Sequence, residues 1–284
     1  MKLCRFGAPG HEKPGIVDRE GRIRDLSAHL ADLTPEALAT ERLAALARLD
    51  IKSLPVVEGS PRLGPPVARV PKFIAIGLNY RDHAEEAGLA IPSEPIIFMK
   101  ATSCITGPND AIVQPPHSTK LDWELELGLV IGSTARYVDE AHALDHVAGY
   151  CIVNDVSERA FQMQSSQWDK GKGCDSFGPI GPWLVTRDEV PDPQNLDMTL
   201  AVNGQRRQSG NTATMIFSVA QIVAYCSRYM TLVPGDVITT GTPPGVGMGM
   251  KPPQWLKPGD ELHLSIEGLG EQRQRVVTET AGRR

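Results

Sequence analysis

Cysteine, excess charge and basic clusters are all scarce in this sequence of 284 residues. The five cysteines are widely separated and form no Cys-x-x-Cys pair, which argues against both a disulfide framework and a zinc knuckle. The net charge is −5, and no run of lysine or arginine exceeds two residues. A nucleic-acid partner is therefore not expected.

Long apolar segments are missing as well. No apolar run reaches the length of a membrane-spanning helix, and the first seven residues lack the apolar core of a signal peptide. We therefore expect a reduced, cytoplasmic protein without a membrane partner. Hydrophobic residues make up 41% and charged residues 22% of the chain, which is typical of a globular protein with a sizeable core.

Two domains are predicted from the distribution of proline and of apolar segments. Residues 1–70 form a small N-terminal unit, in which the pattern favours a hairpin over 14–23 and a helix over 34–49. The last part of this unit, from residue 54, is a connector with too many prolines for regular structure. Residues 71–284 are expected to form the larger domain.

Short apolar segments separated by turn residues dominate the larger domain. They predict strands over residues 73–77, 95–100, 147–154, 183–185, 198–202, 236–240 and 261–267. The best helix is predicted over 215–230, where apolar residues form one stripe that faces a core. No period of 20–50 residues repeats, which excludes a repeat protein.

The most informative segment is 120–131, in which apolar and polar residues alternate. Period two predicts a strand with one face in a core, and it places Glu124 and Glu126 side by side, roughly 6.5–7 Å apart at their Cα atoms. Two carboxylates near a core repel each other, so either one takes up a proton or a cation lies between them. A hard divalent ion is a natural cation for oxygen ligands. The alternative is the exposed polar face of an edge strand.

A third carboxylate follows the buried strand at 147–154. Asp155 stands directly after this strand, where a metal site with three carboxylates would need it. Its alternative role is to cap a helix predicted over 156–164, and both roles are compatible.

A histidine and a glutamate lie three residues apart after the strand at 73–77. We expect a short helix that begins with Asp82 as its cap and ends at Gly88, so that His83 and Glu86 share one face. A carboxylate beside an imidazole orients it and makes an acid/base pair. The alternative is a solvated surface pair without function.

Two glycine-rich segments complete the candidate features. Residues 167–179 are also cationic and could wrap an anionic ligand, although they match neither a P-loop nor a GxGxxG turn. Residues 241–247 form a loop whose backbone can approach a ligand closely.

Six segments occur together and in one order, and together they resemble the fumarylacetoacetate hydrolase superfamily. They are Gly77–His83, Phe98–Lys100, Glu124–Glu126, Asn154–Arg159, Lys172–Asp175 and Gly241–Gly247. The resemblance implies a mixed, β-rich α+β fold with a β-roll or β-sandwich catalytic domain. It also implies a homodimer, with pairing into a homotetramer as the alternative.

The resemblance also assigns roles to ten residues. Three carboxylates would hold one magnesium or manganese ion: Glu124, Glu126 and Asp155. A water-activating dyad and an active-site lysine would perform the chemistry: His83, Glu86 and Lys172. Four side chains would contact the substrate or lie near the metal: Arg159, Gln162, Thr242 and Lys100.

The activity implied by the resemblance is hydrolysis of a carbon–carbon bond in a 2,4-diketo acid of the acylpyruvate type, which gives pyruvate and a small carboxylic acid. A 2,4-diketo-3-deoxy sugar acid, such as a rhamnonate or fuconate derivative, would give lactate. The same site would serve an oxaloacetate decarboxylase, a ureidoglycolate lyase, or a keto-acid hydratase or isomerase. A ligand-binding protein without catalysis is the alternative from another class, but it would keep a costly charge cluster without use.

Overall fold

Two large β-sheets make up most of the fold in residues 1–279, which are the residues that the computed structural model describes. The strands of the eleven-stranded sheet are β1 (Lys2–Phe6), β2 (Lys13–Val17), β3 (Ile23–Asp25), β4 (Leu63–Gly64), β5 (Phe73–Gly77), β6 (Ile96–Lys100), β7 (Ile105–Thr106), β10 (Leu125–Ile131), β11 (Val147–Asn154), β13 (Gly178–Thr186) and β16 (Val237–Thr239). Its hydrogen-bonded order is β3-β2-β1-β13-β11-β10-β16-β5-β6, with β4 beside β1 and β7 beside β13.

A second sheet has five strands, and two short strands form a separate ribbon. The five are β8 (Ile112–Gln114), β14 (Asp197–Val202), β15 (Gln205–Asn211), β17 (Glu261–Ile266) and β18 (Gly270–Thr278), in the order β15-β14-β17-β18-β8. The ribbon pairs β9 (Leu121–Asp122) with β12 (Ser157–Glu158). The helices are α1 (Thr40–Leu46), α2 (Arg81–Ala87), α3 (Glu140–Ala143), α4 (Arg159–Gln162), α5 (Asp169–Lys172) and α6 (Val219–Tyr229).

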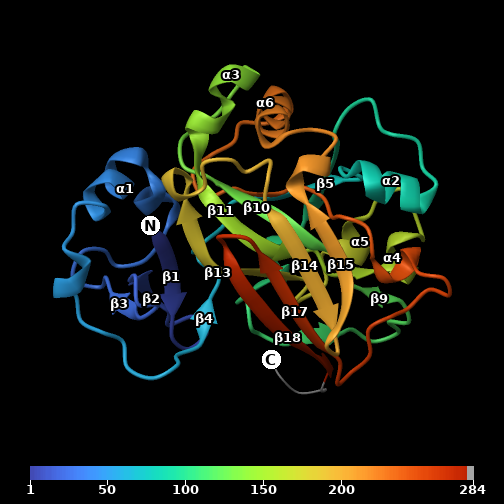
Figure 1. The fold of residues 1–284 in the computed structure, drawn as a ribbon, viewed down its shortest axis with the longest axis horizontal. Helices are drawn as coiled ribbons and strands as arrows, with labels where there is room; N and C mark the ends of the chain where they lie inside the picture. Colours follow the sequence, from blue (N-terminus) through green and yellow to red (C-terminus); the bar gives the residue numbers. More distant parts are fainter. Residues whose placement is uncertain (280–284) are drawn as a thin grey trace.

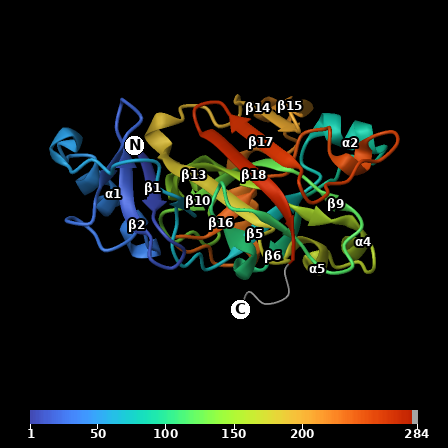
Figure 2. The ribbon, with the colours of Figure 1, turned by 90° about the horizontal axis from the view of Figure 1, so that it is seen from below.

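The two sheets pack against each other, and within the described residues neither closes into a barrel. β14, β17 and β18 contact β10 and β11, and Figure 1 shows them in front of the larger sheet. The N-terminal strands and α1 lie at one end of the molecule, whereas α2, α4 and α5 lie at the other end in both views (Figures 1 and 2). The predicted mixed, β-rich α+β class is confirmed.

The larger sheet runs through the N-terminal segment. β1 pairs antiparallel with β13, with Lys2 opposite Val185 and Leu3 opposite Leu184. Hydrogen bonding therefore continues between residues 1–70 and the rest of the chain, and the division into two domains stays a prediction. No helix in residues 1–279 combines the length and the apolar composition that a membrane crossing requires.

The acidic segment differs from its prediction. The sequence predicts one strand over 120–131 with one buried face, whereas the structure has β9 and β10 with a break at Trp123 and Glu124. All seven residues of β10 are buried. β11 and β16 flank this strand and β14 of the second sheet packs against it, so the strand lies inside the molecule and not at an edge.

Three predicted helices also differ. The helix expected over 34–49 is divided at Ala39, whose φ of −56° and ψ of 143° are not helical. The helix expected over 156–164 is replaced by β12 and the short α4, whose N-cap is Glu158 rather than Asp155. Tyr80, not Asp82, is the N-cap of α2.

The predicted helix over 215–230 is present as α6. It begins at Val219 because Ser218 accepts a hydrogen bond from the Gln221 amide while the Gln221 side chain accepts one from the Ser218 amide. This capping box satisfies backbone donors that the first turn leaves free.

Replacing Leu127 by alanine tests the central position of β10. Leu127 is fully buried, so Leu127→Ala should lower the free energy of unfolding by about 2–5 kcal/mol, measured by urea denaturation. Ile131→Val, on the same strand, should cost only about 0.5–1.5 kcal/mol. Equal effects of the two substitutions would contradict tight packing around Leu127.

Candidate active site and metal centre

Three carboxylates from two neighbouring strands converge at one point. Glu124, Glu126 and Asp155 are buried, and each offers an oxygen atom within 4.8 Å of the others. The antiparallel register places Leu125 opposite Asn154, and the Asp155 amide donates to the Glu124 carbonyl at 2.9 Å. The pairing of β10 with β11 therefore brings Asp155 to the glutamates, although it is about thirty residues away in sequence.

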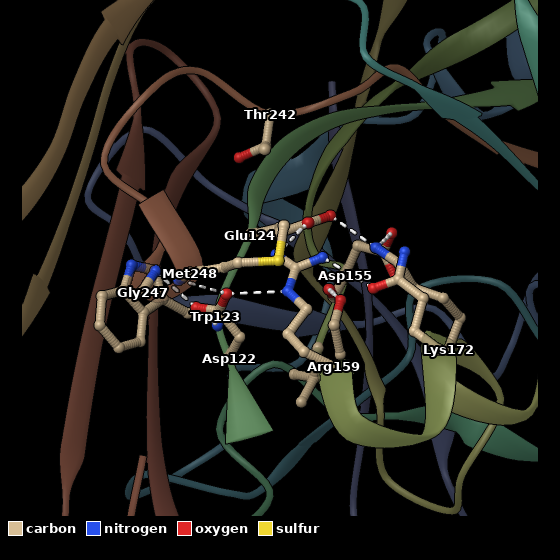
Figure 3. A network of polar contacts seen from close by, with 12 residues as sticks. Asp122, Trp123, Glu124, Asp155, Arg159, Lys172, Thr242, Gly247 and Met248 are labelled. Atoms are coloured by element: carbon tan, nitrogen blue, oxygen red, sulfur yellow. Dashed lines mark hydrogen bonds and ion pairs between the residues drawn. The ribbon is translucent and has the colours of Figure 1, made fainter. Parts of the chain in front are cut away.

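Buried cations surround two of these carboxylates (Figure 3). The Lys172 ammonium donates to Glu124 and to Asp155, at 2.7 Å each. The Arg159 guanidinium donates to Glu124 at 2.5 Å, and Lys100 donates to Asp155 at 2.5 Å. Because both carboxylates have charged partners, their burial is compensated.

Glu126 lacks such a partner among the described residues. One of its oxygens accepts hydrogen bonds from the Thr239 hydroxyl at 2.5 Å and from the Gly241 amide at 2.8 Å. Burial, together with the charges of Asp155 and Glu124, raises the pKa of Glu126 well above its usual value. Without a cation, this group therefore favours its protonated form.

The opposite shift holds for Glu124. Burial alone would raise its pKa, but the charges and hydrogen bonds of Lys172 and Arg159 outweigh burial and lower the pKa. Two glutamates that are two residues apart thus have opposite pKa shifts, because among the described residues only Glu124 has cations beside it.

The donor set fits a hard divalent ion. Three carboxylate groups with oxygen atoms this close match the preference of magnesium and manganese for oxygen ligands. In the network around them, four carboxylates face three cations, so one negative charge is left without a cation. The carboxylates are Asp122, Glu124, Glu126 and Asp155, and the cations are Lys100, Arg159 and Lys172. Glu124, Glu126 and Asp155 are therefore the residues that would hold the ion.

Asp122 is part of the network, and no role was predicted for it from the sequence. Its oxygens accept from Arg159 Nε at 2.8 Å, from the Gly247 amide at 2.6 Å and from the Met248 amide at 3.0 Å (Figure 3). It therefore fixes the glycine-rich loop and the guanidinium that pairs with Glu124. The signal was available, because Asp122 precedes Glu124 by two residues in the same alternating segment.

His83 and Glu86 lie on α2. His83 Nδ1 is 3.2 Å from Glu86 Oε2, and the Gly245 amide donates to Glu86 at 3.0 Å. His83 lines the same cavity as Glu124 and Asp155, and this cavity has a volume of about 320 Å³. A proton acceptor and the candidate metal site thus face one space.

Two of the predicted substrate contacts line this cavity in different ways. Gln162 accepts a hydrogen bond from Arg159 at 3.0 Å. The Thr242 hydroxyl donates to the Leu125 carbonyl at 2.9 Å and accepts from Gln208 at 2.7 Å. The single hydroxyl proton of Thr242 is therefore already used within the protein.

Lys100 is not among the described residues that line the cavity, whereas a residue that contacts the substrate would have to be. Its side chain is buried, and its ammonium group donates a hydrogen bond to Asp155. Besides Asp155, its ammonium contacts the carbonyl oxygens of Val156, at 3.4 Å, and Lys172. This position suits a residue that orients Asp155 and the Lys172 segment.

Because the pKa of Glu126 is raised, we expect that a substitution of this residue can remove metal binding without lowering the stability of the metal-free protein. Glu126→Gln should abolish retention of manganese, measured by elemental analysis of the purified protein, because it removes one ligand charge. Stability of the metal-free protein should not fall, because the raised pKa already favours a neutral group at this position. Glu261→Gln, on an exposed position of β17, is the matched control and should retain the metal.

Comparison with known proteins shows the family of this chain. The family profile described as "Fumarylacetoacetate (FAA) hydrolase C-terminal" matches residues 72–277. A relative from Burkholderia multivorans (strain ATCC 17616 / 249), provisionally named as a hydrolase, is 64% identical over 276 residues, which is 96% of this chain and 98% of the relative.

Several solved structures share the fold. Fumarylacetoacetate hydrolase (EaFAH) from psychrophilic Exiguobacterium antarcticum is 38% identical, with a TM-score of 0.89 over 98% of this chain and 100% of that chain. Maleylpyruvate hydrolase from Sphingobium sp. SYK-6, in complex with manganese (II) ion and pyruvate, is 30% identical, with a TM-score of 0.83 over 99% and 100% of the two chains. The 5-carboxymethyl-2-hydroxymuconate delta-isomerase from Mycobacterium smegmatis is 32% identical, with a TM-score of 0.77 over 99% and 100%. The chain therefore belongs to the fumarylacetoacetate hydrolase family.

Proposed function

We propose that this protein hydrolyses the bond between carbons 3 and 4 of a 2,4-diketo acid, with a bound divalent ion, and releases pyruvate and a carboxylic acid. The observation that supports this most is that the three carboxylates and His83 line one cavity, while Glu86 contacts the His83 ring. The similar hydrolase whose structure contains manganese and pyruvate agrees with both the ion and one product.

Water activation falls to His83. Because Nδ1 faces Glu86, Nε2 is the nitrogen free to take a proton from water, and the resulting hydroxide attacks carbon 4. Glu86 is held by the Gly245 amide, which fixes the orientation of the imidazole. When the bond to carbon 3 breaks, the same proton can return from His83 to carbon 3, so the proton balance closes within the cavity.

Stabilisation of negative charge falls to Lys172 and to the ion. Burial opposes the charged form of Lys172, but Asp155 and Glu124 outweigh it and raise its pKa, so the ammonium stays a donor for the oxyanion on carbon 4. Arg159 and Gln162 lie beside it for the substrate carboxylate. A divalent ion bound here supplies Lewis-acid stabilisation of the enolate that cleavage leaves.

A second candidate is isomerisation of an unsaturated 2-oxo acid. It is favoured by the 32% identical structure of an isomerase, and by the fact that the histidine–glutamate pair can move protons without adding water. Both reactions use the same charged groups. Mass spectrometry distinguishes them, since hydrolysis gives two products and isomerisation gives one of unchanged mass.

The panel that tests the proposal contains acylpyruvates, oxaloacetate, ureidoglycolate and a 2,4-diketo-3-deoxy sugar acid, each with magnesium or manganese. Pyruvate is measured with lactate dehydrogenase, and the second product by mass spectrometry. Metal-dependent release of pyruvate and an acid from a diketo acid supports the proposal. Turnover of only the other substrates, or full activity in excess chelator, would contradict it. The substrate predicted from the sequence resemblance is the sugar acid, whose cleavage would give pyruvate and lactate.

Assembly is a separate proposal. We propose that the chain forms a homodimer, as the sequence resemblance implies, and light scattering should then give the mass of two chains. The mass of one chain would refute pairing, and the mass of four would show that dimers pair further.

Removing the imidazole should separate chemistry from metal binding. His83→Ala should lower kcat by roughly 10²–10⁴-fold, which is the usual contribution of a positioned acid or base. The metal content should stay unchanged, because His83 belongs to α2 and is not one of the three metal-site carboxylates. Glu86→Gln keeps the shape of the pair and should have a smaller effect on kcat. Unchanged kcat in His83→Ala would remove His83 from the mechanism.

A further inference from the structure

We propose that the acyl end of the substrate is an uncharged, apolar chain or ring, rather than a polyhydroxylated chain or a second carboxylate. This inference rests on the proposed function, and it concerns the part of the cavity beyond the charged groups. Three observations carry it: an apolar wall that begins at Lys172, an apolar rim, and the lack of a free cation.

The apolar wall touches the charged groups directly. Lys172 Nζ lies 5.3 Å from the centre of the Phe98 ring, and the Phe98 ring meets Trp168 edge-on at 5.2 Å between ring centres. Trp168 in turn packs against Gly77, where an added Cβ would lie 2.6 Å from the indole ring. A substrate whose carbon 4 meets Lys172 therefore has its acyl group beside aromatic surface.

The rim of the cavity is apolar as well. The described residues include eight large hydrophobic side chains that are exposed, and four of them line this one cavity. They are Leu89, Ile96, Met163 and Met248. Scattered exposed hydrophobic residues are ordinary, but a cluster around the opening of one pocket marks a surface that binds an apolar group.

The cavity offers nothing free to a second carboxylate. Among the described residues that line it, the only lysine or arginine side chains are Arg159 and Lys172, and the proposed function already uses them for the substrate's own carboxylate and for the oxyanion on carbon 4. A carboxylate at the apolar end would lose hydration without gaining an ion pair.

Hydroxyl groups on the acyl chain would also find few hydrogen-bond partners in this cavity. The Thr242 hydroxyl donates to the Leu125 carbonyl, and the Gln162 side chain is assigned, with Arg159, to the carboxylate of the 2-oxo acid end. The side chains on the side of Phe98 and Trp168, and at the rim, are aliphatic, aromatic or thioether. An apolar chain, by contrast, gains about fourfold in affinity for each methylene that it buries.

The test compares chains that differ in one property. We would measure kcat/KM of the full chain, loaded with manganese, for 2,4-dioxopentanoate, 2,4-dioxooctanoate, 7-hydroxy-2,4-dioxooctanoate and 2,4-dioxoheptanedioate. Three added methylenes should raise kcat/KM by roughly 50-fold from the first substrate to the second. The hydroxylated and the dicarboxylate substrates should both fall below 2,4-dioxooctanoate by about tenfold or more. Preference for either polar substrate would overturn the inference.

A binding measurement keeps this result distinct from failure of the proposed reaction. Calorimetric titration of the manganese-loaded protein with 2-oxooctanoate and with pyruvate needs no turnover. Tighter binding of 2-oxooctanoate, by tenfold or more, supports the apolar wall even where no diketo acid is cleaved, in which case the proposed hydrolysis alone would fall. Equal binding of the two acids would overturn the inference while leaving hydrolysis intact.

A new cation at the rim gives a second check. Met163 is 71% exposed, so Met163→Arg should fold, and it should raise the ratio of kcat/KM for 2,4-dioxoheptanedioate over 2,4-dioxooctanoate by about tenfold. Tyr229→Arg adds the same charge at a position on α6 that is 64% exposed and outside the cavity lining, and it should not change this ratio. An equal ratio in the two variants would overturn the inference.

Discussion

Compensation of buried negative charge is the constraint on which the rest of the structure depends. Carboxylates that lose their hydration and repel one another remain together only where cations or protons offset them. Here Arg159 and Lys172 both donate to Glu124, and Lys100 supports Asp155 from the side away from the cavity. The one carboxylate without a cation, Glu126, is the group whose charge a divalent ion would balance.

The sheets explain why this cluster can form at all. β10 and β11 lie inside the larger sheet and beneath the second one, so their positions are fixed by hydrogen bonds on both sides and by packing. The charged residues stand at the start of one strand and after the end of the other, where the regular ladder stops. A rigid scaffold thus presents polar groups at its edge, where a ligand can reach them without breaking the core.

The cavity combines two environments in a short distance. On one side, ion pairs hold carboxylates and an ammonium in fixed positions, and on the other side the rings of Phe98 and Trp168 exclude water. Exclusion of water strengthens the electrostatic interactions at the charged side. The same boundary makes the cavity selective, because an apolar group is accepted where a second charge would be left unpaired.

Local sequence patterns determined much of this site. The closeness of Glu124 and Glu126, an acid after a buried strand, and a histidine three residues before a glutamate follow from short-range signals, and they hold in the folded chain, whereas the single strand over 120–131 does not. Their order along the chain also indicated the family that the comparisons show. These features depend on residues within a few positions of one another, so the sequence alone carries them.

Only the tertiary structure decided how distant segments use these groups. Asp122 accepts a hydrogen bond from the Gly247 amide in a distant loop. The Thr242 hydroxyl donates to the Leu125 carbonyl, and Lys100 donates to Asp155. The full burial of β10 depends on its place between β11 and β16 and on its contact with the second sheet, which its own alternating pattern could not indicate. Each of these outcomes depends on contacts across many tens of residues, and local periodicity contains no information about such contacts.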